Sequence, residues 1–104
     1  MKSLAITAAI LAAFLATPAM ANPEAAMNKA GCMACHAKDK KMVGPSFKDI
    51  AAKYKGQADA PAKLAEKVRK GGSGVFGPIP MAPNGPDKIS DADLKSAIEF
   101  ILKS

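Results

Sequence analysis

The most informative stretch of this chain is Gly31-Cys32-Met33-Ala34-Cys35-His36. Two cysteines three positions apart, followed directly by a histidine, form the pattern at which haem of the c type is attached to protein. Each thiol adds to one vinyl group of the porphyrin, so the ring edge is fixed to one short turn and the next residue lies beneath the iron. The chain contains one histidine, so His36 is the one imidazole that can ligate this iron. We therefore predict one covalently bound haem c per chain, attached through Cys32 and Cys35.

Other uses of two cysteines fit this sequence less well. A thioredoxin-like redox pair is expected within a βαβ unit, and no such pattern surrounds Cys32 and Cys35. A structural zinc site needs four ligands, whereas the chain has two cysteines and one histidine. A chance match in a small exported chain is the third alternative, and the mass of the mature protein, with or without one haem, distinguishes it.

Residues 1–21 have the features of a secretory signal peptide. A positive charge at Lys2 precedes an apolar stretch over residues 4–15, and Thr17-Pro18-Ala19-Met20-Ala21 has the small residues of a cleavage site. The alternative, an uncleaved membrane anchor, is disfavoured because the apolar stretch is shorter than the roughly 20 residues that span a bilayer. We expect cleavage before Asn22, export to the periplasm, and a mature domain over residues 22–104 without stable membrane insertion.

Beyond the leader, the apolar residues follow helical spacing without strand-like alternation. Four short helices are predicted from N-terminal capping signals: Asn22-Pro23 for the first, Ser46 with Asp49 for the second, Asp59-Ala60-Pro61 for the third, and Ser90 with Asp93 for the fourth. A domain of this size rarely buries enough apolar surface to be stable by itself. An enclosed haem supplies the missing surface, so we predict an all-α fold of about four short helices wrapped around one covalently bound haem.

A loop rich in glycine and proline, Gly71–Pro86, separates the third and fourth helices and contains Met81. An iron held by imidazole on one side has a second axial position, and a methionine thioether there raises the reduction potential. Met33 lies within the attachment motif, Met42 follows the motif closely, and Met27 falls on the apolar side of the first helix. Met81 has enough chain to reach the far face of the ring, and prolines on both sides favour ligation. A packing role for Met81 stays open, since methionine commonly fills gaps in cores.

The chain resembles the short bacterial class I cytochromes c, most closely the c-551/c-552 type, over essentially the whole mature length. The matching stretches are residues 31–36, 42–45 and 56–58, and Gly74-Val75-Phe76-Gly77-Pro78-Ile79-Pro80-Met81. The first stretch indicates only attached haem, whereas the last, at this distance from the first, is specific to the group. The resemblance implies a small class I cytochrome c fold, thioethers at Cys32 and Cys35, and His36 and Met81 as the axial ligands.

The resemblance also implies contacts around the iron ligands. The carbonyl of Pro45 is expected to accept a hydrogen bond from His36, and Asn84 is expected to donate one to the Met81 sulfur. Lys67 occupies the position of a basic residue that contacts a haem propionate, and a solvated surface lysine is the alternative. Ordinary structural roles, a helix-start proline and a turn asparagine, are open to Pro45 and Asn84 alongside these.

The glycine- and proline-rich loop departs from the family pattern. Phe76 stands where the group usually has tryptophan, so an indole N–H directed to a haem propionate is missing and Lys67 is expected to carry more of that contact. Val75 and Ile79, in the same matching stretch, are expected to contact the haem. The connection over residues 84–90 is also slightly longer than in the group.

The charge balance indicates the class of partner. The chain has 15 Lys and Arg against 9 Asp and Glu, a net charge of +6 at neutral pH, and loss of Lys2 with the leader lowers this by one, to +5, before the propionates are counted. Neither a nucleic-acid-binding motif nor interleaved aromatic residues accompany this charge, so binding to nucleic acid is not expected. We expect electrostatic docking on acidic patches of redox proteins, in small and short-lived complexes.

These observations predict a monomeric one-electron carrier and not an enzyme, because an iron with both axial positions filled has no vacancy for oxygen or peroxide. By resemblance, its partners are redox proteins such as respiratory complexes, terminal oxidases, nitrite reductases or haem peroxidases. The alternative is a haem enzyme or gas sensor with a labile sixth ligand, which carbon monoxide binding by the ferrous protein would reveal.

Overall fold

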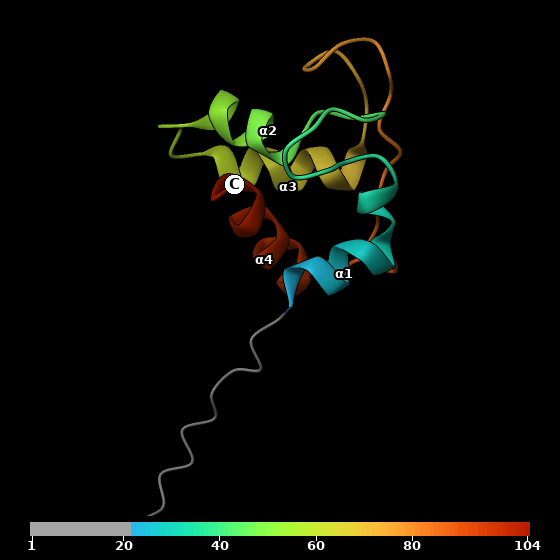
Figure 1. Ribbon diagram of the computed structural model, residues 1–104. Helices are drawn as coiled ribbons and strands as arrows, with labels where there is room; N and C mark the ends of the chain where they lie inside the picture. Colours follow the sequence, from blue (N-terminus) through green and yellow to red (C-terminus); the bar gives the residue numbers. More distant parts are fainter. Residues whose placement is uncertain (1–21) are drawn as a thin grey trace, which may run out of the picture.

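The computed structural model describes residues 22–104, whose elements are α1 (Pro23–Ala30), the 3₁₀ turn η1 (Cys32–Ala34), α2 (Phe47–Tyr54), α3 (Ala60–Lys70) and α4 (Asp91–Leu102) (Figure 1). Extended pairing within these residues is limited to one antiparallel bridge between Gly72 and Met81. The all-α class and the four predicted helices are confirmed. No helix in this part of the chain combines the length and apolar character of a membrane span. The expected signal peptide, residues 1–21, lies outside the described residues.

Three of the four helices begin at the polar caps that the sequence predicts. The side chains of Asn22, Ser46 and Ser90 each accept a hydrogen bond from the backbone N–H three residues on, at 3.2, 3.0 and 3.1 Å. Each bond satisfies an N–H group that a helix start leaves without a partner, a contribution of about 1 kcal/mol. The remaining helix, α3, also begins where the sequence predicts, at Ala60 after Asp59, but the Asp59 side chain makes no capping bond and pairs instead with Lys63 at 3.2 Å.

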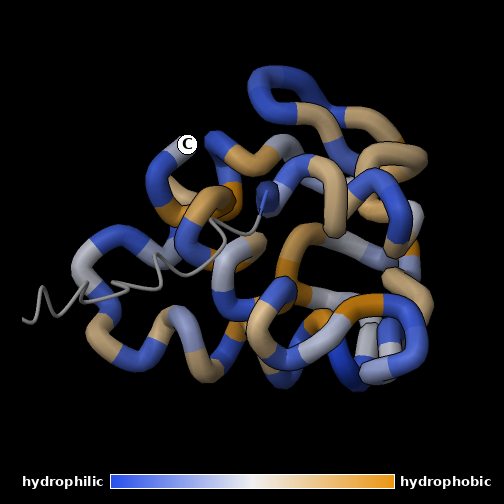
Figure 2. The backbone as a smooth tube through the Cα atoms, turned by 90° about the horizontal axis from the view of Figure 1, so that it is seen from below, coloured by the Kyte–Doolittle hydropathy of each residue, from blue (hydrophilic) through white to orange (hydrophobic). Residues whose placement is uncertain are grey.

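The central element of the fold is α4, which packs against α1, α2 and α3 (Figure 1). Its buried residues Leu94, Ala97 and Ile98 follow the helical spacing predicted from the sequence. The same buried cluster includes residues from the other elements: Met27 from α1, Phe47 and Ile50 from α2, Leu64 from α3, and Ile89 just before α4. Figure 2 shows apolar and polar positions interleaved along the chain, as burial of one face of each helix requires.

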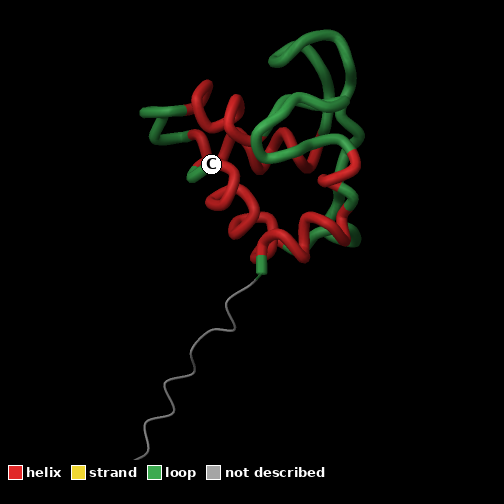
Figure 3. The backbone as a smooth tube through the Cα atoms, viewed as in Figure 1, coloured by secondary structure: helices red, strands yellow, loops and turns green. Residues whose placement is uncertain are grey.

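Two long loops complete the domain. Residues 35–46 follow η1 and residues 71–90 connect α3 to α4, and both lie in the upper and right-hand part of Figure 3. Residues of both loops and of all four helices line one cavity, with the helical core on one side and the loops on the other. Large apolar side chains of the loops are exposed along it: Val43, Val75, Phe76 and Ile79. The small core is therefore the floor of a cavity and not a closed interior, as expected for a fold built around a cofactor.

Candidate functional site

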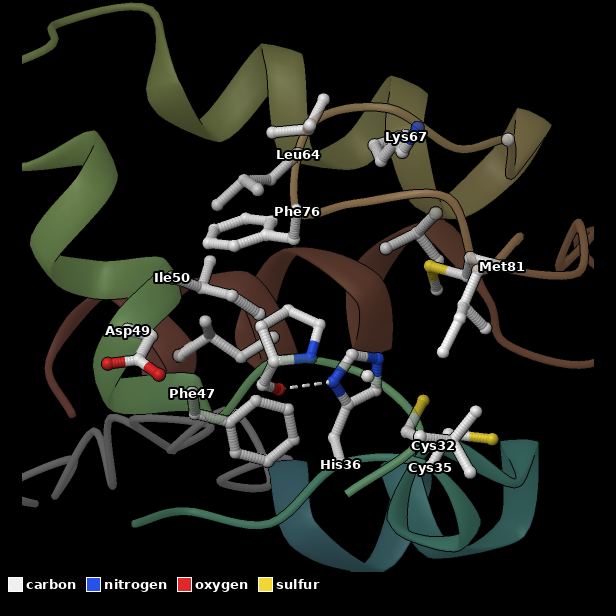
Figure 4. Close-up of a pocket in the computed structure, with 18 of the residues that line it drawn as sticks. Cys32, Cys35, His36, Phe47, Asp49, Ile50, Leu64, Lys67, Phe76 and Met81 are labelled. Carbon is white, nitrogen blue, oxygen red and sulfur yellow. Dashed lines mark hydrogen bonds between the residues drawn. The ribbon is translucent and has the colours of Figure 1, made fainter. Parts of the chain in front are cut away.

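The helices and loops enclose a cavity of about 570 Å³, within the range of about 300–1,000 Å³ that is usual for small-molecule and cofactor sites. Much of its lining is apolar and belongs to the helical core, including Phe47, Ile50 and Leu64 (Figure 4). Nine of the residues that the sequence predicts for the haem site line this cavity: Cys32, Cys35, His36, Pro45, Lys67, Val75, Phe76, Ile79 and Met81. The tenth, Asn84, does not line it.

The attachment motif forms the turn η1 directly after α1. The backbone N–H groups of Cys35 and His36 both donate to the carbonyl of Cys32, at 3.1 and 3.0 Å, and the side chains of all three line the cavity (Figure 4). Both thiols are free; Cys32 is half-buried and Cys35 is exposed. Burial raises the pKa of the Cys32 thiol. The turn therefore presents two thiols beside a single imidazole, which is the arrangement that covalent haem attachment needs.

The ring of His36 is fixed by a hydrogen bond and by packing. Its Nδ1 lies 2.7 Å from the carbonyl oxygen of Pro45 (Figure 4). Because a carbonyl only accepts, Nδ1 carries the proton in this contact and Nε2 keeps a lone pair. The ring stacks on Phe47, with centroids 5.5 Å apart and planes 23° from parallel. The imidazole is thus held in one orientation, and its Nε2 takes no part in the contact with Pro45.

Gly44 belongs to the site although the sequence analysis did not identify it. A Cβ atom at this position would lie 2.5 Å from Cε1 and 2.9 Å from Nδ1 of the His36 ring, closer than Cβ atoms normally approach. The N–H of Gly44 donates to the carbonyl of Cys35 at 2.8 Å, which brings the loop back against the attachment turn. The available signal was a glycine directly before Pro45 in a stretch that matches the family.

Met81 lies in an extended segment beside the end of α3. The N–H of Gly72 donates to the carbonyl of Met81 at 3.0 Å, and the N–H of Met81 donates to the carbonyl of Gly72 at 2.9 Å. The Met81 side chain faces the cavity from the loop after α3, whereas His36 faces it from the start of the loop after η1 (Figure 4). The structure therefore brings to one cavity the nitrogen and sulfur side chains that the sequence predicts as axial ligands.

Asn84 is placed differently from the expectation by resemblance. It is buried, with 9% of its surface exposed, and its Nδ2 donates to the carbonyls of Ala82 at 3.1 Å and Val68 at 3.5 Å. An amide nitrogen has two hydrogens, and both are directed here at backbone oxygens. Donation to the Met81 sulfur therefore requires another rotamer of Asn84 and stays a prediction.

The residues expected around the propionates and the ring edge line the cavity. Lys67 lines the cavity from α3, and a Cβ atom on Gly72 would lie 3.3 Å from its Nζ. Phe76 lines it from the loop, and the Nζ of Lys53 lies 5.5 Å from the centre of its ring. Phe76 and its apolar neighbours in the loop are 40–59% exposed, so their surfaces are available for contact with a ligand: Val75 41%, Phe76 40% and Ile79 59%.

Arg69 is a second residue that the sequence analysis did not identify. Its Nη1 donates to the carbonyls of Asn84 at 3.2 Å and Ile89 at 2.7 Å, and its Nη2 pairs with Asp91 at 2.6 Å. These bonds hold the connection between the Met81 loop and α4. The sequence indicates this role of Arg69 only weakly. Arg69 is the single arginine of the chain, and a guanidinium group can bind several acceptors at once.

Comparison with known proteins shows the family. The family model described as Cytochrome c matches residues 20–104. The chain belongs to the cytochrome c family. Cytochrome c2 from Rubrivivax gelatinosus is 56% identical over 84 residues, covering 81% of this chain and 99% of that protein. Cytochrome c-551 from Pseudomonas aeruginosa is 48% identical over 81 residues, covering 78% of this chain and 75% of that protein.

The fold agrees with solved structures of such cytochromes. The crystal structure of wild-type cytochrome c552 from Nitrosomonas europaea has a TM-score of 0.70 to this chain and is 48% identical, covering 77% of this chain and 96% of that one. The protein is therefore a class I bacterial c-type cytochrome that carries one covalently bound haem c. It is a small electron carrier with redox proteins as partners, and it is not an enzyme.

The cavity of this cytochrome c fits that cofactor. Its apolar walls suit a porphyrin, and two thiols, one imidazole nitrogen and one thioether are groups that attach and ligate haem. Within residues 22–104, no group of three or more His, Cys, Asp and Glu side chains lies close enough together to hold a metal ion without a porphyrin. The donor set therefore favours haem over the zinc interpretation of the cysteine pair.

Proposed function

We propose that this cytochrome is a soluble, monomeric, periplasmic one-electron carrier whose haem is held covalently by Cys32 and Cys35 and axially by His36 and Met81. The observation that supports this assignment is one apolar cavity faced by both thiols, by the only imidazole of the chain, and by a thioether from a separate loop. The bound haem supplies the chemistry, which is exchange of one electron between its ferrous and ferric states.

In this proposal, the attachment turn and His36 act together. The sulfurs of Cys32 and Cys35 would hold the edge of the ring, and the imidazole of His36, directly after Cys35, would then be placed to ligate the iron. The carbonyl of Pro45, 2.7 Å from Nδ1, orients the imidazole and raises the basicity of Nε2. Stacking on Phe47 limits rotation of the ring. A ligand restrained in this way keeps its orientation when the charge of the site changes.

Met81 supplies the second axial ligand in this proposal. A thioether is a soft ligand that favours the ferrous state and raises the reduction potential. When side chains fill both axial positions, oxygen and peroxide find no vacancy, and the same two ligands serve both oxidation states. Little rearrangement then accompanies electron transfer, which suits a carrier.

Other residues complete the proposed site. Val75, Phe76 and Ile79 give apolar contact along the ring, which their exposure at the cavity supports. Lys67 pairs with a propionate at the rim, where Phe76 offers no indole donor. Asn84 donates to the sulfur of Met81 in another rotamer, in which its Nδ2 leaves the carbonyls of Ala82 and Val68.

The proposed location and partners rest on the sequence. The signal-peptide pattern of residues 1–21 supports export, and an exported protein with covalent haem at both cysteines avoids the disulfide that an oxidising compartment favours. The positive net charge supports docking on acidic surfaces of respiratory complexes, terminal oxidases, nitrite reductases or haem peroxidases.

Replacement of Met81 by alanine tests the axial ligation. Met81→Ala should retain the mass of one covalent haem, because Cys32 and Cys35 are untouched. The ferric form should lose its sulfur-to-iron charge-transfer band, and the ferrous form should bind carbon monoxide and acquire some peroxidase activity. The matched control is Met42→Ala, which removes an exposed methionine that does not line the cavity.

Each alternative has its own signature in this experiment. Survival of the charge-transfer band in Met81→Ala would show that Met81 is not the ligand. Ready binding of carbon monoxide by the unmodified ferrous protein would show a labile sixth position, as in a haem enzyme or gas sensor. The mass of the exported protein also gives the position of signal-peptide cleavage, expected before Asn22.

A further inference from the structure

The end of α3 is joined through the backbone to the segment that carries Met81. We call this contact, between residues 68–72 and residues 81–84, the α3–Met81 junction. Two hydrogen bonds pair Gly72 with Met81, at 3.0 and 2.9 Å, and the N–H of Asn84 donates to the carbonyl of Val68 at 2.9 Å. The last bond satisfies one of the carbonyls that the end of a helix leaves without a partner. The junction therefore extends α3 into the methionine segment.

Gly71 lies at the centre of the α3–Met81 junction. A Cβ atom at this position would overlap the carbonyl oxygen of Met81, and it would lie 2.8 Å from the nitrogen of Pro83 and 2.9 Å from the carbonyl carbon of Ala82. All of these are backbone atoms, which cannot turn aside as the end of a side chain can. Gly71 also has φ 69° and ψ −151°, a region populated almost entirely by glycine. A side chain at this position is incompatible with the junction.

The middle of the same loop is held differently. Residues 72–80 are exposed, and the N–H of Gly74 donates within the loop, to the carbonyl of Gly77 at 2.8 Å. Phe76 contacts the helices through Lys53, whose Nζ lies 5.5 Å from the ring centre. Exposed contacts of this kind contribute little. The position of Met81 therefore depends on the junction more than on the middle of the loop.

We propose that Gly71 is a positioning residue for Met81. The missing side chain lets residues 81–83 pack directly on the end of α3, and this contact sets where the thioether of Met81 enters the cavity. Because α3 itself packs on α4, the junction links the methionine to the helical core. The inference rests on the proposed ligation by Met81. Displacement of the methionine should weaken its bond to the iron, so that an external ligand competes better for the same position.

The test compares Gly71→Ala with Gly74→Ala in the haem-loaded protein. Gly74 also has a positive φ, 103°, but a Cβ atom there would have open space around it, so it controls for backbone strain in the same loop. In Gly71→Ala we expect a weaker sulfur-to-iron charge-transfer band. The apparent Kd of imidazole for the ferric protein should fall at least about tenfold, equivalent to about 1.4 kcal/mol. Gly74→Ala should change this Kd by less than a factor of about two.

Met81→Ala separates this inference from the ligation on which it rests. If Met81→Ala abolishes the band while Gly71→Ala leaves the band and the imidazole affinity unchanged, the positioning role is wrong and ligation stands. If Met81→Ala changes neither property, both proposals fail. An equally weakened charge-transfer band in Gly71→Ala and Gly74→Ala would also overturn the positioning role. Backbone strain anywhere in the loop would then be enough to weaken the bond between Met81 and the iron.

Hydrogen exchange in the unmodified haem protein provides a second measurement. It tests whether the α3–Met81 junction holds Met81 in place even if Gly71→Ala does not fold. The amide hydrogens of Gly72, Met81 and Asn84 donate across the junction and should exchange at least about tenfold more slowly than those of the exposed residues Val75 and Phe76. Equal exchange rates in the two groups would overturn the positioning role.

Discussion

At the scale of single residues, the imidazole of His36 is confined from several directions. The carbonyl of Pro45 accepts from Nδ1, the ring of Phe47 stacks on it, and the backbone at Gly44 passes so close that a Cβ atom would lie 2.5 Å from Cε1. Family resemblance implies the first contact. The other two depend on how the loop after η1 folds back, and only the structure supplies them.

Gly44→Ala should therefore destabilise the haem protein by about 1–3 kcal/mol, the usual cost of added volume in a packed site. Neither Gly44 nor Gly85 has a φ in the left-handed region, so alanine is allowed by the backbone at both positions. The matched control is Gly85→Ala, where the added Cβ would meet the side-chain oxygen of Asp87 at 2.7 Å, and that side chain can turn aside. Gly85→Ala should change stability by no more than about 0.5 kcal/mol.

Denaturant unfolding of the two variants and the unmodified protein measures this difference. Displacement of the imidazole should also shift the reduction potential in Gly44→Ala and leave it unchanged in Gly85→Ala. Equal stabilities for the two variants would mean that the ring of His36 is free to move away from Gly44.

At the scale of elements, α3 supports the site from its last two turns. Lys67 lines the cavity, Gly71 ends the helix against the methionine segment, and Arg69 donates to backbone oxygens on the way to α4. The ion pair between Lys70 and Glu66, also on α3, is exposed to solvent. The side-chain hydrogen bond and the charge of Lys70 lower the pKa of Glu66. Water screens such a pair, so it adds little to stability. We therefore expect α3 to contribute to stability mainly through its contacts with the loop over residues 71–90.

Arg69→Lys tests the contribution of these contacts to stability, because lysine keeps the positive charge but lacks the planar guanidinium group that binds several acceptors. The carboxylate of Asp91 is 93% exposed, so its ion pair with Arg69 contributes little. The larger effect comes from the carbonyl of Ile89, a buried residue whose 2.7 Å bond would be lost. We expect Arg69→Lys to lower the free energy of unfolding by about 1–3 kcal/mol.

Asp91→Asn is the control for Arg69→Lys, since it removes the exposed charge and leaves both carbonyl bonds of Arg69 in place. Thermal unfolding should show a small change for Asp91→Asn beside the larger loss for Arg69→Lys. The reverse order would assign the stabilisation to the ion pair.

At the scale of the whole molecule, the excess of lysines should act on encounters with partners. The chain has a net charge of +6, reduced by one when Lys2 leaves with the signal peptide. Electron exchange with an acidic redox partner should slow as ionic strength rises, because a Debye length of about 10 Å at 0.1 M salt screens exposed charges. Stopped-flow rates over a salt series measure this, with an uncharged redox reagent as control.

The control reaction should show little dependence on salt. A rate with the acidic partner that stays flat or rises with salt would contradict docking through lysines. It would instead favour docking through the exposed apolar side chains along the cavity: Val43, Val75, Phe76 and Ile79.

Much of the fold and of the proposed site was predictable because the signals are local. A helix start requires a polar cap and its first turn, so Asn22, Ser46 and Ser90 identified three starts correctly. Asp59-Ala60-Pro61 identified the remaining start correctly, since α3 begins at Ala60, although the Asp59 carboxylate makes no capping bond and pairs with Lys63. The four predicted helices and the class of cofactor were confirmed.

The cofactor and the order of the helices could be predicted from the sequence, because each depends on residues that are neighbours along the chain. The surroundings of Gly44, the bonds of Arg69 and the rotamer of Asn84 come from the tertiary structure alone, as do the contacts on which the proposed role of Gly71 rests. Arg69 bonds to a carbonyl 20 residues away, and Asn84 to one 16 residues away. Contacts of this kind depend on which segments the folded chain brings together around the cavity. No local pattern in the sequence indicates that residues so far apart along the chain will meet.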